Sequence, residues 1–122
     1  MMIRIKRVYD PPEPTDGKRI LVDRLWPRGL SKAGARVDVW AKQVAPSTEL
    51  RQWYGHDAAK WAQFQARYLA ELRENPQAVE RLLQEIGEEP VTLLFASRDR
   101  QRNNAVVLKT YLEDIMRRRG FR

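Results

Sequence analysis

The fold of this chain is decided by the stretch Val91-Thr92-Leu93-Leu94-Phe95-Ala96, its longest nearly apolar run. Pro90 comes directly before this run, whose apolar residues predict a buried strand. Beyond the polar segment 97–104, apolar residues recur at helical spacing and predict a last helix over about 104–118. A buried strand followed by an amphipathic helix is typical of α/β proteins.

Upstream of this strand, the sequence predicts three further helices. A long amphipathic helix is expected over about 58–74, with Asp57 as its N-cap. Another is expected over 76–86, where Asn75 can cap and a proline occupies the first helical position. A short helix is expected directly after Ser47, whose hydroxyl suits the N-cap position.

Three shorter segments are predicted to be strands. Residues 3–8 alternate apolar with charged side chains, which indicates an edge strand, and Ile20-Leu21-Val22 suits a strand buried on both faces. A third strand is predicted over Val37–Val44, although helical spacing fits this segment as well. The expected fold class is therefore α/β, with a small, mostly parallel sheet of about four strands flanked by helices. Whether the first two strands are parallel or antiparallel stays open.

Length and composition narrow the possible classes of protein. The chain has 122 residues, so we expect a single domain over 1–122 with a basic C-terminal tail at 117–122. It has no cysteine, which excludes a disulfide framework, a thiolate metal site and a cysteine nucleophile, and we expect no metal and no cofactor. No apolar run approaches the length of about 20 residues that crosses a bilayer, and no signal peptide is visible at the N-terminus. We therefore expect a soluble, cytoplasmic protein.

The charge of the chain indicates anionic partners. The formal net charge is +7 at neutral pH, and arginines concentrate between Arg98 and Arg102 and again in the tail. These two clusters make weak, nonspecific nucleic-acid binding an alternative function, in which the protein is regulatory. Docking of the basic tail on an acidic partner, as a protein-interaction module, is a further alternative.

Polar clusters follow three of the predicted strands. Asp23–Arg28 comes after the second strand, Ala45–Ser47 after the third, and 97–104 after the last. Because ligands of open α/β sheets bind beyond the carboxyl ends of the strands, parallel strands would bring these clusters to one rim. The sequence therefore predicts a binding site there, on the condition that the strands are parallel.

The side chains in these clusters suit a phosphate-bearing anion. Arginine offers a planar fork of donors, helix N-termini add N–H groups, and a tryptophan between arginines can stack on a flat ligand. We predict these ligand-binding residues: Arg24, Trp26, Arg28, Ser47, Arg51 and Asn104. The candidates for acid–base roles are His56, Asp23 and Asp99, and hydrolysis or group transfer is the reaction class that fits best.

Short motifs spread over nearly the whole chain carry a resemblance to a known family. They are Val8-Tyr9-Asp10, Val22-Asp23-Arg24-Leu25-Trp26-Pro27-Arg28-Gly29, Ala45-Pro46-Ser47, Leu50-Arg51, Trp53, Gly55-His56, Phe64, Arg67-Tyr68, Thr92-Leu93-Leu94 and Asn104-Ala105. With these motifs the chain resembles the YeaO-like branch of domain-of-unknown-function family 488. The resemblance implies a compact α/β domain and no established activity.

The same resemblance limits the chemistry that can be expected. Many members of the wider family have a cysteine on the last strand and a Cys-His-Arg sequence before the last helix. The corresponding positions here are Phe95 and Asn103-Asn104-Ala105. The resemblance therefore implies that any reaction of that cysteine has been changed or lost in this branch.

Overall fold

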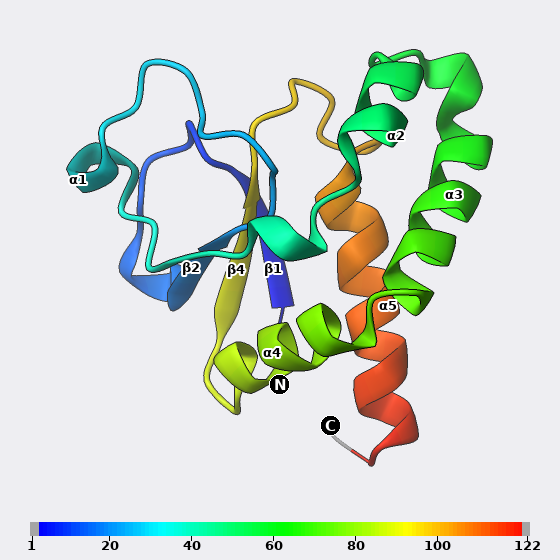
Figure 1. Cartoon of the computed structure of the whole chain (residues 1–122). Helices are drawn as coiled ribbons and strands as arrows, with labels where there is room; N and C mark the ends of the chain where they lie inside the picture. The colour runs from blue at the N-terminus through cyan, green and yellow to red at the C-terminus, as the bar shows by residue number, and fades with distance from the viewer. Residues whose placement is uncertain (1–2, 121–122) are drawn as a thin grey trace.

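A sheet of four strands forms the centre of the computed structural model, which describes residues 3–120 (Figure 1). The strands are β1 (Ile3–Arg7), β2 (Lys18–Leu21), β3 (Val39–Trp40) and β4 (Val91–Phe95). The α-helices are α1 (Lys32–Ala35), α2 (Thr48–Tyr54), α3 (Trp61–Arg73), α4 (Pro76–Ile86) and α5 (Asn104–Arg118). Single 3₁₀ turns occur at Pro14–Asp16, Lys42–Val44 and Ala58–Lys60.

The strands lie in the order β1-β4-β2-β3, and every neighbouring pair is parallel. Leu93 of β4 is in register with Ile5 of β1 on one side and with Ile20 of β2 on the other. Since β1 and β2 both run parallel to β4, they also run parallel to each other, which answers the question left open by the sequence. The predicted α/β class with a small parallel sheet is confirmed.

The position of β4 between two strands explains its apolar sequence. All five of its side chains are buried, because both its edges are paired and both its faces are covered. β1 lies at the edge of the sheet, as its alternating charged residues predicted, and β2 lies in the interior. The last strand and the last helix, Val91–Phe95 and Asn104–Arg118, therefore agree with their predicted bounds within one residue.

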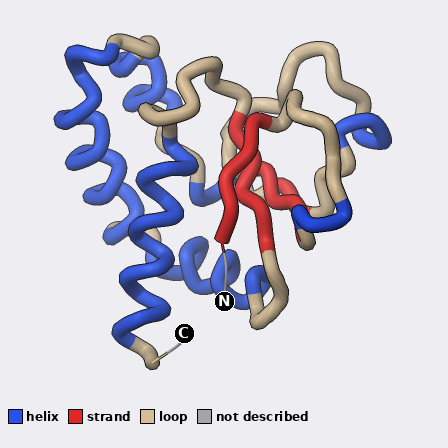
Figure 2. Tube along the Cα trace, turned by 180° about the vertical axis from the view of Figure 1, so that it is seen from behind, coloured by secondary structure: helices blue, strands red, loops and turns tan. Residues whose placement is uncertain are grey.

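One face of the sheet carries the main hydrophobic core. Ile20 and Leu93 contribute to this core from the sheet, Tyr68 from α3, and Leu108 from α5, and all four are fully buried. Both views show α2, α3 and α5 on the same side of the strands, while α4 crosses below them near the N-terminus (Figure 1, Figure 2). The strands point away from α4, so their carboxyl ends meet the loops at the opposite end of the molecule.

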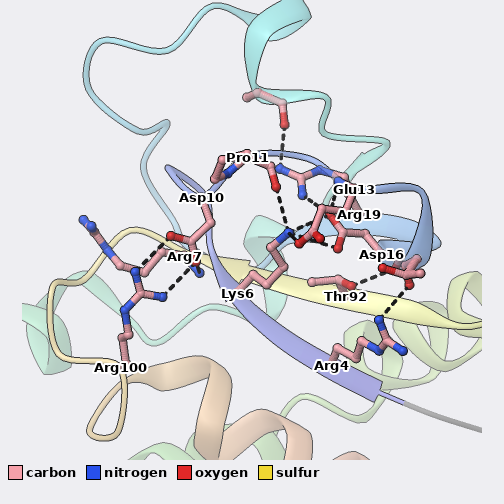
Figure 3. Close-up of polar contacts among 12 residues, drawn as sticks. Arg4, Lys6, Arg7, Asp10, Pro11, Glu13, Asp16, Arg19, Thr92 and Arg100 are labelled. Carbon is pink, nitrogen blue, oxygen red and sulfur yellow. Dashed lines mark hydrogen bonds and ion pairs between the residues drawn. The ribbon is translucent and has the colours of Figure 1, made fainter.

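The opposite face of the sheet is divided into an apolar and a polar part. Leu21 and Leu94 pack with Ala35 and the partly buried Trp26 and Trp40 in a small second core. Figure 3 shows the polar part, in which Lys6, Asp16, Arg19 and Thr92 come together beneath the loop that follows β1.

Asp16 is the centre of this polar cluster. Its buried carboxylate accepts hydrogen bonds from Arg19 Nη1 at 2.6 Å and from Lys6 Nζ at 3.0 Å, and also from the Glu13 N–H. Arg19 is buried too and donates to the carbonyl oxygens of Ala35 and Arg36. The cluster thus joins the edge strand, the interior strand and the α1 segment by charged hydrogen bonds.

Two local predictions need correction. The third strand is limited to Val39–Trp40, because only these residues pair with β2 before the chain turns into the 3₁₀ turn Lys42–Val44. Asn75 stands at the N-cap position of α4, but its side chain makes no capping hydrogen bond there and donates instead to the carbonyl oxygen of Gln43. Packing between distant segments decides both differences.

None of the helices within residues 3–120 is both long and apolar enough to span a bilayer.

Candidate functional site

A pocket of about 810 Å³ opens at the carboxyl ends of the strands. Its volume lies in the usual range for small-molecule sites, about 300–1,000 Å³. Eight of the nine site residues predicted from the sequence line it, namely Asp23, Arg24, Trp26, Arg28, Arg51, His56, Asp99 and Asn104. The sheet is parallel, which was the condition for this prediction, and the segments after β2 and β4 line the pocket together with Pro46 of the Ala45–Ser47 cluster.

The Asp23 carboxylate joins the segment after β2 to the segments before α5. It accepts hydrogen bonds from the Ala96 N–H at 2.9 Å and from Asn104 Nδ2 at 3.1 Å. Asn104 Nδ2 also donates to the Val22 carbonyl oxygen, so the two segments are held at two points. Burial raises the pKa of Asp23 above its ordinary value, although these hydrogen bonds and the positive charge of Arg51 oppose the rise.

Arg24 lines the pocket, and two hydrogen bonds fix the position of its guanidinium group. Its Nε donates to the carbonyl oxygen of Pro46 and its Nη2 to that of Ala45, both at 3.1 Å. Within residues 3–120, no hydrogen bond or ion pair occupies its Nη1. Arg24 is half-buried and hydrogen-bonded to carbonyl groups, whereas its neighbour Asp23 does not pair with it.

Three further arginines carry positive charge to the pocket wall. Arg28, Arg51 and Arg98 come from the segment after β2, from α2 and from the segment after β4, and all three are exposed. Among the described residues, none of their guanidinium groups has a hydrogen bond or an ion pair. These groups therefore keep all of their donors available for a ligand.

The 97–104 segment owes its shape to Asp99. The carboxylate of Asp99 accepts from the N–H groups of Gln101 and Arg102 and pairs with the Arg102 guanidinium at 3.3 Å. These hydrogen bonds lower the pKa of Asp99 below its ordinary value. The carboxylate that the sequence offered as an acid–base candidate is therefore ionised near neutral pH and organises the loop.

Trp26 is held at the side of the pocket by the second core. Its indole N–H donates to the Leu30 carbonyl oxygen at 2.7 Å, and its ring meets the edge of Trp40 at a centroid distance of 5.4 Å. The Trp40 indole in turn donates to the Asp23 carbonyl oxygen. Trp26 thus lines the pocket with its orientation fixed by two contacts.

His56 lies at the mouth of the pocket, on an exposed turn after α2. Its backbone has a φ of +58°, following Gly55 at +54°, so two successive residues adopt the left-handed conformation. This turn directs the chain from α2 to the Asp57 cap of the next helical turn.

Ser47 is the predicted site residue that the structure does not place in the pocket. Its hydroxyl donates to Glu71 Oε2 at 2.5 Å and accepts from the Leu50 N–H, and its own N–H donates to Glu71 Oε1. Glu71 lies on α3, 24 residues away, so no local pattern could have indicated this pairing. Ser47 acts as the cap of α2 and as its link to α3.

Apart from Trp26, the aromatic side chains of the pocket were not predicted from the sequence. Tyr54 and Phe64 stack at a centroid distance of 4.3 Å and also line the pocket. The Tyr54 hydroxyl donates to the Arg102 carbonyl oxygen at 3.1 Å. Tyr9, beyond the end of β1, forms part of another wall and donates to the Arg28 carbonyl oxygen. The Val8-Tyr9-Asp10 motif was the available signal for this wall.

The two basic clusters of the sequence are largely paired. Arg100 binds Asp10 with two hydrogen bonds of 2.8 and 2.9 Å, and Arg102 pairs with Asp99. In the tail, Arg117 and Arg118 pair with Asp114 and Arg119 pairs with Glu80. Arg122, the last arginine of the predicted tail, lies outside the described residues.

The fold and the pocket define a small α/β protein with a basic pocket at the carboxyl ends of a parallel sheet. Residues 2–120 match a family model described as the inactive DUF488-N3 subclade. The chain therefore belongs to the DUF488 family, as its motifs indicated.

Curated relatives agree with this assignment. The chain is 44% identical over 115 residues to "Uncharacterized protein YeaO" of Escherichia coli (strain K12). The aligned region covers 94% of this chain and 100% of the relative. It is 43% identical over 110 residues to "Uncharacterized protein Rv3073c" of Mycobacterium tuberculosis (strain ATCC 25618 / H37Rv), which covers 90% of this chain and 92% of the relative. No solved structure matches the chain.

Proposed function

We propose that the pocket binds a small, phosphate-bearing anion. The observation that carries this proposal is the gathering in one pocket of Arg24 and Arg28, from the segment after β2, with Arg51 of α2. Arginine matches phosphate through two parallel hydrogen bonds, and it stays charged at every physiological pH. The pocket thus presents the guanidinium hydrogen-bond donors that such an anion needs.

The charge balance of the pocket supports an anionic ligand. Five arginines line it against only two aspartates. Both carboxylates are already hydrogen-bonded, Asp23 to Ala96 and Asn104 and Asp99 within its own loop, and neither forms an ion pair with Arg28 or Arg51. A pocket with unpaired positive charge raises the local concentration of anions and speeds their entry.

Binding without turnover is the form of the function that we favour. Asp23 and Asp99, two of the three candidate acid–base groups, serve as hydrogen-bond acceptors that hold the pocket together. The family model is described as inactive, which supports the same choice. The hydrolase or transferase activity that the sequence allowed is therefore not part of this proposal.

Nucleic-acid binding is less well supported than a small-molecule site. The predicted contacts were Arg98–Arg102 and the tail, but Arg100, Arg102 and Arg119 are paired with carboxylates. A duplex would have to compete with these ion pairs for phosphate contacts at these three arginines.

The proposal predicts a thermal shift that depends on two exposed arginines. A saturating ligand at about a hundred times its Kd adds about 2.7 kcal/mol to the free energy of unfolding. For a domain of this size, that gain corresponds to a rise in Tm of about 8–16 °C. We expect such a rise for at least one member of a panel of phosphate, sugar phosphates, nucleotides and small carboxylates at constant ionic strength, and its loss in Arg28→Ala with Arg51→Ala.

A matched control separates the pocket from general charge effects. Arg73 and Arg81 are exposed and lie outside the pocket, so Arg73→Ala with Arg81→Ala removes the same charge elsewhere. We expect this control to keep the full ligand response of the parent. If both double variants respond like the parent to every compound, or if no compound shifts Tm, the anion site is not in this pocket.

A further inference from the structure

We propose that the ligand carries a flat, apolar ring beside its phosphate, so that it belongs to the aryl or heteroaryl phosphates. Tyr9, Leu25 and Trp26 form the ring subsite at the mouth of the pocket. This inference rests on the proposed anion site and adds the chemistry of the rest of the ligand.

The first observation is the exposure of two large apolar side chains. Leu25 is 58% exposed and Tyr9 is 41% exposed, and no other large apolar residue of the described chain is classed as exposed. Both line the pocket. Exposed apolar side chains that line one pocket commonly mark a site of interaction, because contact with a ligand or partner removes them from water.

The second observation is that these side chains adjoin the arginines of the anion site. Leu25 and Trp26 follow Arg24 directly in the chain, and Arg28 comes two residues later. The Tyr9 hydroxyl donates to the Arg28 carbonyl oxygen at 2.9 Å, which fixes the Tyr9 ring against the segment that carries Arg28. A ligand held by these arginines therefore has its remaining atoms within reach of an apolar surface.

The third observation is that the aromatic rings of the subsite are held in place. Trp26 is positioned by Leu30 and Trp40, as described above, and the Arg7 guanidinium lies 4.9 Å from the centre of the Tyr9 ring. Rings that are already ordered lose little freedom when a ligand ring packs on them. Pairs of aromatic rings also gain energy beyond the area that they bury. A sugar or glycerol attached to the phosphate would pack less well than an aromatic ring on these apolar surfaces.

Isothermal titration with three simple probes tests the inference. Inorganic phosphate, glycerol 3-phosphate and phenyl phosphate share the phosphate group but differ in what it carries. We expect phenyl phosphate to bind at least about fivefold more tightly than glycerol 3-phosphate, in line with the usual gain from an aromatic pair. Tyr9→Ser with Leu25→Ser is expected to remove this preference, measured as the ratio of the affinities for phenyl phosphate and glycerol 3-phosphate in the same variant.

A conservative double variant serves as the control. Tyr9→Phe with Leu25→Met keeps an aromatic ring and a large apolar side chain at the same positions, and we expect it to retain the preference for phenyl phosphate. Both affected side chains are exposed, and thermal unfolding of each variant confirms that it is folded.

The possible outcomes distinguish the two proposals. If all three probes bind equally and their binding requires Arg28 and Arg51, the anion site stands and the ring subsite is wrong. If no probe binds, the proposed function itself fails. If Tyr9→Ser with Leu25→Ser alters the oligomeric state in light scattering while the preference for phenyl phosphate persists, the apolar patch contacts a second copy and the ring subsite is overturned.

Discussion

An Asp16→Ala variant is expected to lose about 3–5 kcal/mol of unfolding free energy, which is the usual loss when one partner of a buried ion pair is removed. Asp16 and Arg19 are 2% and 4% exposed, and the carboxylate is held by Lys6, Arg19 and the Glu13 N–H. Without Asp16, the charge of Arg19 stays buried with only carbonyl partners. Urea unfolding followed by circular dichroism measures the difference.

The same cluster is expected to make the protein sensitive to acid. Burial by itself would raise the pKa of Asp16, but hydrogen bonds from the Glu13 N–H, Lys6 and Arg19 outweigh burial and hold it below the ordinary value. A lowered pKa in the folded state stabilises the protein above the ordinary pKa of about 4, and this gain is lost as the pH falls through the lowered value. Asp16→Ala should therefore show a smaller loss of stability than the parent between about pH 4 and pH 2.

The exposed Glu88 provides a control for this prediction. Glu88→Ala removes one carboxylate from a surface turn between α4 and β4, and we expect a change below about 0.5 kcal/mol. If Asp16→Ala were no more destabilising than Glu88→Ala, the buried charge cluster would not hold β1, β2 and α1 together.

A Gly17→Ala variant is expected to lose at least about 3 kcal/mol of unfolding free energy. Gly17 has a φ of +64° and a ψ of −143°, a backbone conformation that is nearly restricted to glycine. A Cβ at this position would lie 2.1 Å from the Pro90 carbonyl oxygen. That carbonyl accepts the Lys18 N–H at the start of the pairing between β2 and β4, so relief of the clash would open the sheet.

Gly29→Ala is the control that measures the cost of a positive φ without a steric clash such as that of Gly17 with Pro90. Gly29 also has a positive φ, of +77°, but nothing lies within 4 Å of a Cβ built on it. We expect this variant to lose only about 1 kcal/mol, the usual cost of a left-handed conformation for a residue with a side chain. Equal losses for the two glycines in urea unfolding would show that the approach of Pro90 does not matter.

Local patterns were enough to predict the main elements and much of the pocket. β4 and α5 each contain their own signal, a dense apolar run and a clear helical period, and their bounds followed from it. The polar residues after β2 and β4 predicted a shared site because parallel strands bring such segments to one end of a sheet. Six of the eight predicted side chains in the pocket lie on these two segments, and the other two, Arg51 and His56, come from α2 and the turn after it.

The remaining features depend on contacts between distant parts of the chain. Thr92 donates to the Asp16 carbonyl oxygen across 76 positions, and Asp23 accepts from Ala96 across 73 positions. Asp16 ends a 3₁₀ turn and Arg19 lies near the start of a strand, where charged residues are usually exposed, so nothing local indicated their burial. Ser47 matched a capping pattern and does cap α2. Only the fold reveals that its hydroxyl also donates a hydrogen bond to Glu71, outside the pocket.

The most direct test of the anion site is a crystal structure of the protein soaked with selenate, whose selenium can be located by anomalous scattering. We expect selenate in the pocket at the carboxyl ends of the strands, within about 3 Å of Arg24 Nη1, with Arg28 or Arg51 turned toward it. Selenate that occupies other surfaces while this pocket holds only water would contradict the proposed function.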